Sequence, residues 1–211
     1  MRIGAIEQAL HLYARLRNRL YKLLLLSQFK EAGRGVTIVP PFRFYGLNQI
    51  VLGAYVHIER DCWIQTVPGQ DQEDEAKLII GSHSDIGMGA TISAARRIEI
   101  GDHVLLARNV YISDHRHGFE DIGLPIMRQR INGIVPVSVG RETWLGQNAV
   151  VLPGANIGVH CVIGANSIVN SPIPDFSVAV GAPARVIRRY NQETGAWERV
   201  ADDKQEKIGS Q

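Results

Sequence analysis

The sequence predicts an all-β solenoid, in which short parallel strands wind around a narrow apolar core. Three observations predict it: an aliphatic residue recurs every six positions, glycine often follows it, and a small residue often stands two positions before it. The clearest aliphatic run is Val139, Leu145, Val151, Ile157, Ile163 and Val169. A period of six fits neither a helix nor simple alternation, and it is typical of repeated short units. We expect each unit to form one strand and one turn, and three units to close one coil of the solenoid.

An N-terminal segment, residues 1–32, precedes the repeats and is predicted to contain an amphipathic helix. Within residues 3–31 the apolar side chains follow near-helical spacing. They are Ile6, Leu10, Tyr13, Leu20, Leu23 and Leu24, with Arg15, Arg17, Arg19 and Lys22 among them. Gly33 supplies a stop signal. Two interpretations stay open: an arm packed across the solenoid, or a basic helix lying on an anionic membrane surface.

The repeats are assigned to residues 33–188 and are interrupted twice. The polar stretch QDQEDE at 70–75 is expected to be a solvated loop. Further on, the interval from Ile112 to Val139 corresponds to one and a half coils instead of one, which predicts a loop at 113–136. Residues 189–211 are expected to form a short C-terminal extension. Loops carried by a rigid scaffold commonly hold catalytic groups, so the second loop is the first place to look for a site.

Composition argues against several functions. A net charge of +2 without a Lys/Arg-rich run predicts no binding of nucleic acid. The longest purely apolar run, residues 23–26, is too short to span a bilayer. Cys62 and Cys161 lie in apolar surroundings at no metal-site spacing, so we expect no disulfide and a reducing compartment.

Three stretches of the chain resemble known enzymes. ETWLGQNAVVLPGANIGVHCVIGANSIVNSPIPDFSVAVGAPARVIRRYN at 142–191 is similar to the last coils of hexapeptide-repeat acyltransferases, which fold as left-handed parallel β-helices. YISDHRHG at 111–118 and YNQETGAWERV at 190–200 resemble the lipopolysaccharide O-antigen O-acetyltransferases of that family. The resemblance spans about residues 35–200. It implies the left-handed sense, which parallel crossovers otherwise avoid, acetyl-CoA as a co-substrate without a permanently bound cofactor, and a homotrimer with sites between subunits.

The resemblance also implies a general base at the start of the second loop, where the match falls on His115. This base would take a proton from a sugar hydroxyl as that oxygen attacks the thioester of acetyl-CoA. An imidazole with an unperturbed pKa of about 6.5 is mostly neutral at cytoplasmic pH and suits the task. His117 could orient His115, contact the sugar or cap the loop. Asp114 is disfavoured as the partner of His115, because adjacency in sequence makes that geometry awkward.

The His-x-His pair could instead supply two metal ligands. A catalytic zinc needs a third ligand and an open position. Carbonic anhydrases of the same architecture use three histidines, two of them five residues apart. The remaining candidates do not reproduce that spacing with His115 or His117, so we predict no metal: His57, His83, His103 and His160.

Matching motifs imply that acetyl-CoA lies along the C-terminal coils. The matched positions are Trp144, Gln147, Ala165, Asn170, Ser171, Arg185 and Arg188. Small residues let the pantetheine arm approach the backbone, and arginines suit the nucleotide phosphates. Relatives acting on galactosides and maltose usually have Thr-Lys at 170–171 and an acceptor-binding asparagine where Gly89 stands here. The acceptor pocket is therefore expected to differ, with these candidates: Ser93, Asp114, Arg128 and Arg130.

Together these features predict a cytoplasmic, acetyl-CoA-dependent O-acetyltransferase. Its acceptor would be a sugar hydroxyl of a cell-surface polysaccharide, lipopolysaccharide or precursor, with direct transfer in a ternary complex. The basic N-terminal helix would suit an acceptor tethered to the inner leaflet of the inner membrane. Two alternatives remain: an amino-sugar N-acetyltransferase, and a non-catalytic β-helix scaffold. A scaffold would need neither the loop histidine nor the PARVIR arginines.

Overall fold

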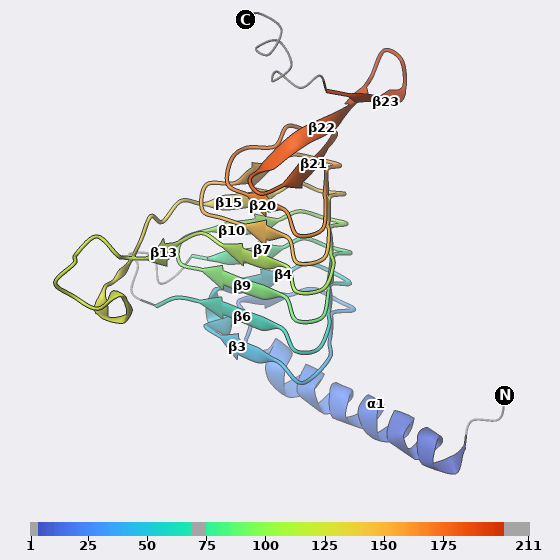
Figure 1. Ribbon diagram of the computed structural model, residues 1–211. Helices are drawn as coiled ribbons and strands as arrows, with labels where there is room; N and C mark the ends of the chain where they lie inside the picture. Colours follow the sequence, from blue (N-terminus) through green and yellow to red (C-terminus); the bar gives the residue numbers. More distant parts are fainter. Residues whose placement is uncertain (1–3, 69–74, 201–211) are drawn as a thin grey trace, which may run out of the picture.

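The computed structural model describes residues 4–68 and 75–200, which form a column of short strands with a helix at its N-terminal end (Figure 1). The predicted polar loop lies outside the described residues from 70 to 74, as do residues 201–211 of the predicted extension. The side chains of Arg15, Arg19, Lys22 and Leu23 also lie outside the described part.

Successive strands of the column visit three parallel sheets in turn, so every three strands complete one coil. The first sheet contains β1 (Glu31–Ala32), β4 (Ile50–Leu52), β7 (Leu78–Ile80), β10 (Ile98–Ile100), β15 (Val137–Val139) and β18 (Asn156–Ile157). The second begins with β2 (Thr37–Ile38), β5 (His57–Ile58), β8 (Asp85–Ile86), β11 (Leu105–Leu106), β16 (Trp144–Leu145) and β19 (Val162–Ile163). The third contains β3 (Arg43–Tyr45), β6 (Trp63–Thr66), β9 (Thr91–Ala94), β12 (Tyr111–Ser113), β17 (Val150–Val151) and β20 (Ile168–Val169). This order agrees with the expected three-strand circuit.

The core is a stack of aliphatic side chains, aligned from coil to coil. Ile92 of β9 pairs with Ile64 of β6 on one side and with Ile112 of β12 on the other. All three are at most 2% exposed. Because successive side chains of a strand point to opposite faces, the residues before and after each core aliphatic point outward. The outer faces of the sheets are therefore available for other roles.

The coils do not all have the length that three six-residue units predict. The step from Ser138 to its partner Asn156 equals three such units, but the step from Leu78 to its partner Ile98 is longer by two positions. The additional positions lie in the strands of the first sheet, where both Ile98 and Ile100 are buried. In the sequence the six-residue aliphatic period moves by two positions, from Ile98 to Ile100, and the extra inward residue in these strands accounts for that shift. The expected coil length holds only after the second loop.

The glycines that follow the core aliphatics allow the coils to stack closely. A Cβ on Gly140 would lie 2.5 Å from the carbonyl carbon of Gly158 in the next coil. Left-handed backbone occurs instead at corner residues such as Asn148 (φ 58°) and Asn166 (φ 59°), a residue type that tolerates this region. Their amides form a ladder, in which Asn148 Nδ2 donates to Asn166 Oδ1 at 3.0 Å.

The helix α1 (Ala5–Leu26) projects from the N-terminal end of the column (Figure 1). Among its described side chains, Leu25 and Leu26, at its end, pack against the core. Its other described large apolar side chains are more than half exposed: Ile6, Leu10, Leu12, Tyr13, Leu16, Leu20 and Leu24. The first interpretation, an arm packed across the solenoid, is therefore not what the structure shows. None of the helices within the described residues has the length and apolar character needed to cross a membrane.

Two further segments depart from the column. Between β12 and β15 the chain leaves as a loop that contains the ribbon β13 (Arg116–His117) and β14 (Ile131–Asn132) and the 3-10 helix η2 (Ile126–Arg128). Ile98 pairs with Val137, about two coil lengths on instead of one, so this loop adds about a whole coil rather than the half coil expected. A second 3-10 helix, η1 (Leu47–Gln49), precedes β4. At the C-terminal end β21 (Ser177–Gly181), β22 (Ala184–Asn191) and β23 (Ala196–Arg199) extend the second sheet, so β22 runs across the expected boundary at 189.

The close approach of coils makes a prediction for Gly140. In Gly140→Ala the new Cβ would force neighbouring backbone apart, so we expect the free energy of unfolding, measured by urea titration, to fall by about 1–3 kcal/mol. Gly123→Ala is the control, because its Cβ would approach only the Asp121 Oδ1 atom, at 3.3 Å, and that side chain can move. Equal stability of the two variants would contradict the stacking role.

Candidate active site

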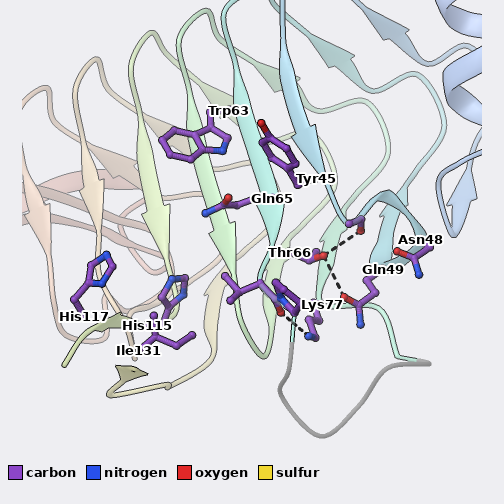
Figure 2. A pocket seen from close by; sticks show the side chains of 13 residues that line it. Tyr45, Asn48, Gln49, Trp63, Gln65, Thr66, Lys77, His115, His117 and Ile131 are labelled. Carbon is purple, nitrogen blue, oxygen red and sulfur yellow. Dashed lines mark hydrogen bonds between the residues drawn. The ribbon is translucent and has the colours of Figure 1, made fainter. Parts of the chain in front are cut away.

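A cavity of about 880 Å³ lies on the outer face of the third sheet, beside the loop between β12 and β15 (Figure 2). His115 and His117 line it on the loop side, and Tyr45, Trp63 and Gln65 line it on β3 and β6. Its volume falls within the range of about 300–1,000 Å³ that is usual for small-molecule sites.

Asp114 anchors the start of the loop. Its carboxylate is fully buried and accepts the backbone N–H groups of Ala95, Arg96 and Arg97, each at 2.7 Å. Its backbone carbonyl accepts the N–H of Val135 at 2.8 Å. Both ends of the loop are therefore held at this one residue, against the turn between β9 and β10.

Asp114 also contacts the imidazole of His115, with 2.9 Å between Oδ1 and Nδ1. Adjacency in sequence by itself disfavours this pair. The structure brings them together because the Ser113 hydroxyl donates to the His115 carbonyl at 2.8 Å and holds a tight turn after β12. A carboxylate that accepts the Nδ1 hydrogen fixes the tautomer and leaves Nε2 as a proton acceptor. The His115 side chain is 11% exposed and reaches the cavity, which Asp114 does not line.

Charge on Asp114 is maintained by its hydrogen bonds. Burial by itself would raise the pKa of this carboxyl. The hydrogen bonds from His115 and from the backbone of Ala95, Arg96 and Arg97 outweigh burial and hold the pKa below its ordinary value. The carboxylate is therefore ionised at neutral pH and can stabilise an imidazolium beside it.

The ribbon positions His117. His117 on β13 pairs with Ile131 on β14, and both line the cavity. His115 and His117 are two residues apart, so along an extended segment their side chains point to the same side. Among residues 4–68 and 75–200, no three His, Cys, Asp or Glu side chains gather to hold a metal ion.

Glu120 joins the two strands of this ribbon. Its carboxylate accepts from Arg116 at 2.9 Å and from Asn132 at 2.7 Å. The backbone N–H of Phe119, together with these donors, lowers the pKa of Glu120 to about 2. The ribbon that carries His117 is thus tied by charge-assisted hydrogen bonds.

The residues expected to contact the acceptor do not lie together in the cavity. Ser93 is 5% exposed, and its Oγ accepts from Gln65 Nε2 at 2.8 Å. Arg128 ends η2 and Arg130 precedes β14; both are exposed on the loop and neither lines the cavity.

Gly89 occupies a corner where the relatives described above carry asparagine. Its φ is +73°, and an added Cβ would lie 2.4 Å from Asn109 Oδ1. A side chain at this position would therefore have to displace the Asn109 amide.

The expected acetyl-CoA contacts are spread over the surface of one chain. Trp144 pairs with Val162, Val162 with Val178 and Val178 with Arg188, which places these four residues in one row across the second sheet. The others lie at corners or on β22: Gln147 and Ala165 between the second and third sheets, Asn170 and Ser171 just after β20, and Arg185 opposite Val180. Of all the expected site residues, the described cavity brings together only His115 and His117.

Sequence pattern alone does not identify three residues of the cavity: Tyr45, Trp63 and Gln65. Each stands next to a core residue, Phe44 or Ile64, and therefore points outward from its strand. For Tyr45 and Trp63, an aromatic residue at an outward position was the available signal of a binding surface.

The buried carboxylate predicts a pH-dependent stability. A carboxyl whose pKa is depressed in the folded state stabilises the protein above its unfolded pKa, about 3.9, and this stabilisation is lost as the pH falls below that value. In Asp114→Asn the amide faces three N–H donors, so at pH 7 we expect a loss of about 1–3 kcal/mol in the free energy of unfolding. Urea titrations from pH 7 to pH 2 measure both effects.

Asp121→Asn is the matched control, because Asp121 is exposed in the same loop and accepts a backbone N–H only from Gly123. Asp114→Asn should lose less stability than the parent protein between pH 5 and pH 2, about the range in which carboxylates titrate. If Asp114→Asn and the parent protein lost equal stability over this range, Asp114 would not be the group responsible for the pH dependence.

Comparison with known proteins identifies relatives of this chain. The repeat described as the hexapeptide repeat of succinyl-transferase matches residues 136–171. A Mycobacterium tuberculosis protein assigned as an acetyltransferase is 39% identical over 73% of this chain. Escherichia coli WbbJ, assigned to lipopolysaccharide biosynthesis as an O-acetyl transferase, is 39% identical over 52% of it. The chain spans only 49% and 59% of the lengths of these two relatives.

Solved structures share the fold. AntD, an N-acyltransferase from Bacillus cereus in complex with dTDP and 3-hydroxybutyryl-CoA, superimposes with a TM-score of 0.68 over 82% of this chain and 89% of its own. At 21% identity this likeness shows the fold alone. The galactoside O-acetyltransferase of Escherichia coli is 39% identical over 80% of this chain and 68% of its own length. With that coverage and the hexapeptide repeat, the chain belongs to the hexapeptide-repeat acetyltransferase family.

Proposed function

We propose that this protein is an acetyl-CoA-dependent O-acetyltransferase. Its acceptor is a sugar hydroxyl of a cell-surface polysaccharide, lipopolysaccharide or precursor. The observation that carries the proposal is the contact of 2.9 Å between His115 Nδ1 and the buried carboxylate of Asp114, at the edge of a cavity. The relatives named for lipopolysaccharide and galactoside O-acetylation support the acceptor class.

The proposed reaction is a direct transfer. Nε2 of His115 takes the proton of the acceptor hydroxyl while that oxygen attacks the thioester carbonyl carbon. The tetrahedral oxyanion collapses, the C–S bond breaks, and the CoA sulfur leaves with the proton returned by His115. Asp114 stabilises the imidazolium formed between these steps. A positioned base of this kind contributes a factor of about 10²–10⁴ in rate.

An amino-sugar acceptor is the second candidate. The fold that this chain shares with an N-acyltransferase is compatible with it. A neutral amine already carries a nucleophilic lone pair, whereas a hydroxyl attacks effectively only as its proton is removed. A histidine held in one tautomer by a buried carboxylate therefore favours the hydroxyl.

The proposal includes a cyclic homotrimer of left-handed β-helices, with acetyl-CoA between neighbouring chains. Its support is the spread of the expected acetyl-CoA contacts over one chain: Trp144 and Arg188 lie on the second sheet, whereas His115 follows β12, an interior strand of the third sheet. A neighbouring copy would bring its own contacts to the histidine.

Changing His115 tests the reaction. We expect His115→Ala to lower thiol release from acetyl-CoA, measured against a panel of sugars, by at least about 100-fold. Acetyl-CoA binding, measured by calorimetry, should persist because the base does not hold the donor. His103→Ala is the control, since His103 is an exposed corner residue stacked on His83, away from the cavity. Retained turnover in His115→Ala would remove this residue as the base.

We also propose a cytoplasmic location with peripheral contact at the inner face of the inner membrane. The exposed apolar residues of α1 include Ile6, Leu10 and Leu20. They are not the residues that pack on the column, which are Leu25 and Leu26. The basic residues in the same segment suit anionic lipid headgroups.

Removal of residues 1–24 tests this contact while sparing Leu25 and Leu26. The shortened protein should stay folded and should no longer co-sediment with vesicles of phosphatidylglycerol and phosphatidylcholine. A full-length Leu10→Glu, Leu20→Glu double variant should show the same loss, because both side chains are exposed and their replacement leaves the column intact. If the unaltered protein does not sediment with anionic vesicles, the membrane contact is refuted.

A further inference from the structure

The outer face of the third sheet carries a row of polar side chains that leads to His115. Strand register places Tyr45 opposite Gln65, Gln65 opposite Ser93, and Ser93 opposite Ser113. The four residues therefore lie side by side on β3, β6, β9 and β12. Tyr45 and Gln65 line the cavity, whereas Ser93 and Ser113 are buried and mark the course of the row toward His115. Three spacings between neighbouring strands make the row about 14 Å long.

Two aromatic rings lie at the end of this row that is remote from His115: Tyr45 in the row and Trp63 beside it. Trp63 is 43% exposed and Tyr45 58% exposed, and Figure 2 shows both rings on neighbouring strands with Gln65 beside them. The Gln65 amide is held by its bond of 2.8 Å to Ser93 Oγ. Its oxygen and its second hydrogen remain for other partners. Two flat apolar surfaces therefore stand next to a fixed polar group.

The wall beyond the rings is built from buried polar residues. The Thr66 hydroxyl lies 3.0 Å from the Gly46 carbonyl and 3.1 Å from Gln49 Oε1. Lys77 Nζ donates to the Val67 carbonyl at 2.8 Å and is 2% exposed. These contacts make the cavity a formed site rather than a gap at the surface.

We propose that this face is an acceptor track for an extended glycan, in which the reacting sugar lies at His115 and further units lie over Gln65, Trp63 and Tyr45. This inference rests on the proposed O-acetyl transfer and names its acceptor as an oligosaccharide rather than a single sugar. A pyranose has apolar C–H faces and a rim of hydroxyl groups. The faces match the rings and the rim matches the amide.

Two observations favour a glycan over a nucleotide sugar. The cavity of about 880 Å³ and the row of about 14 Å exceed one sugar ring. Among the described residues that line it, Lys77 is the one lysine or arginine, and it is buried. A diphosphate would therefore meet no exposed guanidinium or ammonium there. The track runs from His115 toward β3, near the end of the column from which α1 projects (Figure 1).

A length series of acceptors tests the track. The full-length protein is assayed for thiol release from acetyl-CoA with mono-, di- and trisaccharides of glucose, galactose, rhamnose and N-acetylglucosamine, and with UDP-glucose. We expect kcat/KM for the best series to rise by about tenfold from one unit to three. Trp63→Ala should lower kcat/KM for the trisaccharide more than for the monosaccharide. Tyr55→Ala is the matched control, because this aromatic residue is 46% exposed and lies outside the cavity.

Equal kcat/KM for one and three units, equal losses in Trp63→Ala for both, or a preference for UDP-glucose would overturn the track and leave O-acetyl transfer standing. Calorimetry with the trisaccharides on a His115→Ala background separates the two proposals. Binding that Trp63→Ala weakens, without transfer in the parent protein, would support the track and refute the reaction. Absence of trisaccharide binding would overturn the track.

Discussion

Each strand of this column is very short and pairs with strands of the neighbouring coils. Stability therefore comes from stacking, and stacking requires that coils approach within the spacing of a parallel sheet. Gly140 shows how strict this requirement is, because a single methyl group there would meet the backbone of the next coil at 2.5 Å. The narrow interior is filled mainly by aliphatic side chains such as Ile92, and the cavity lies on an outer face.

That requirement explains how a long loop can be inserted without disturbing the column. The strands before and after it, β12 and β15, keep their parallel partners. Asp114 holds the loop with its carboxylate on the turn at residues 95–97 and its carbonyl on Val135. The same carboxylate contacts the His115 imidazole. One buried charge thus contributes both to the stability of the loop and to the chemistry proposed for the histidine, so the two properties cannot be varied independently at this residue.

The regular stacking also aligns residues from different strands on one surface. Tyr45, Gln65, Ser93 and Ser113 lie in one row because each holds the same position relative to the core aliphatic of its strand. The interval in sequence from Gln65 to Ser93 is longer than the interval from Tyr45 to Gln65. The difference arises from the stretch around the polar loop at 70–75, so no fixed period in the sequence would have joined these residues. The pocket and its aromatic rings therefore become visible only once the register is known.

The sequence by itself determined the repeat, the core positions and the place of the loop. These follow from local pattern, because an inward residue every six positions is a property of each strand. The candidate base, His115, came from the resemblance of its stretch to a known family. The shift by two positions at Ile98 and Ile100 was visible but was explained only by their common burial in one strand. Tertiary structure alone decided that Asp114 turns back onto His115, that Trp63 and Gln65 face the same cavity, and that α1 stands away from the column. Each of these depends on a tight turn, a coil register or the packing of a helix end, which involve residues distant in sequence or backbone geometry that residue spacing does not encode.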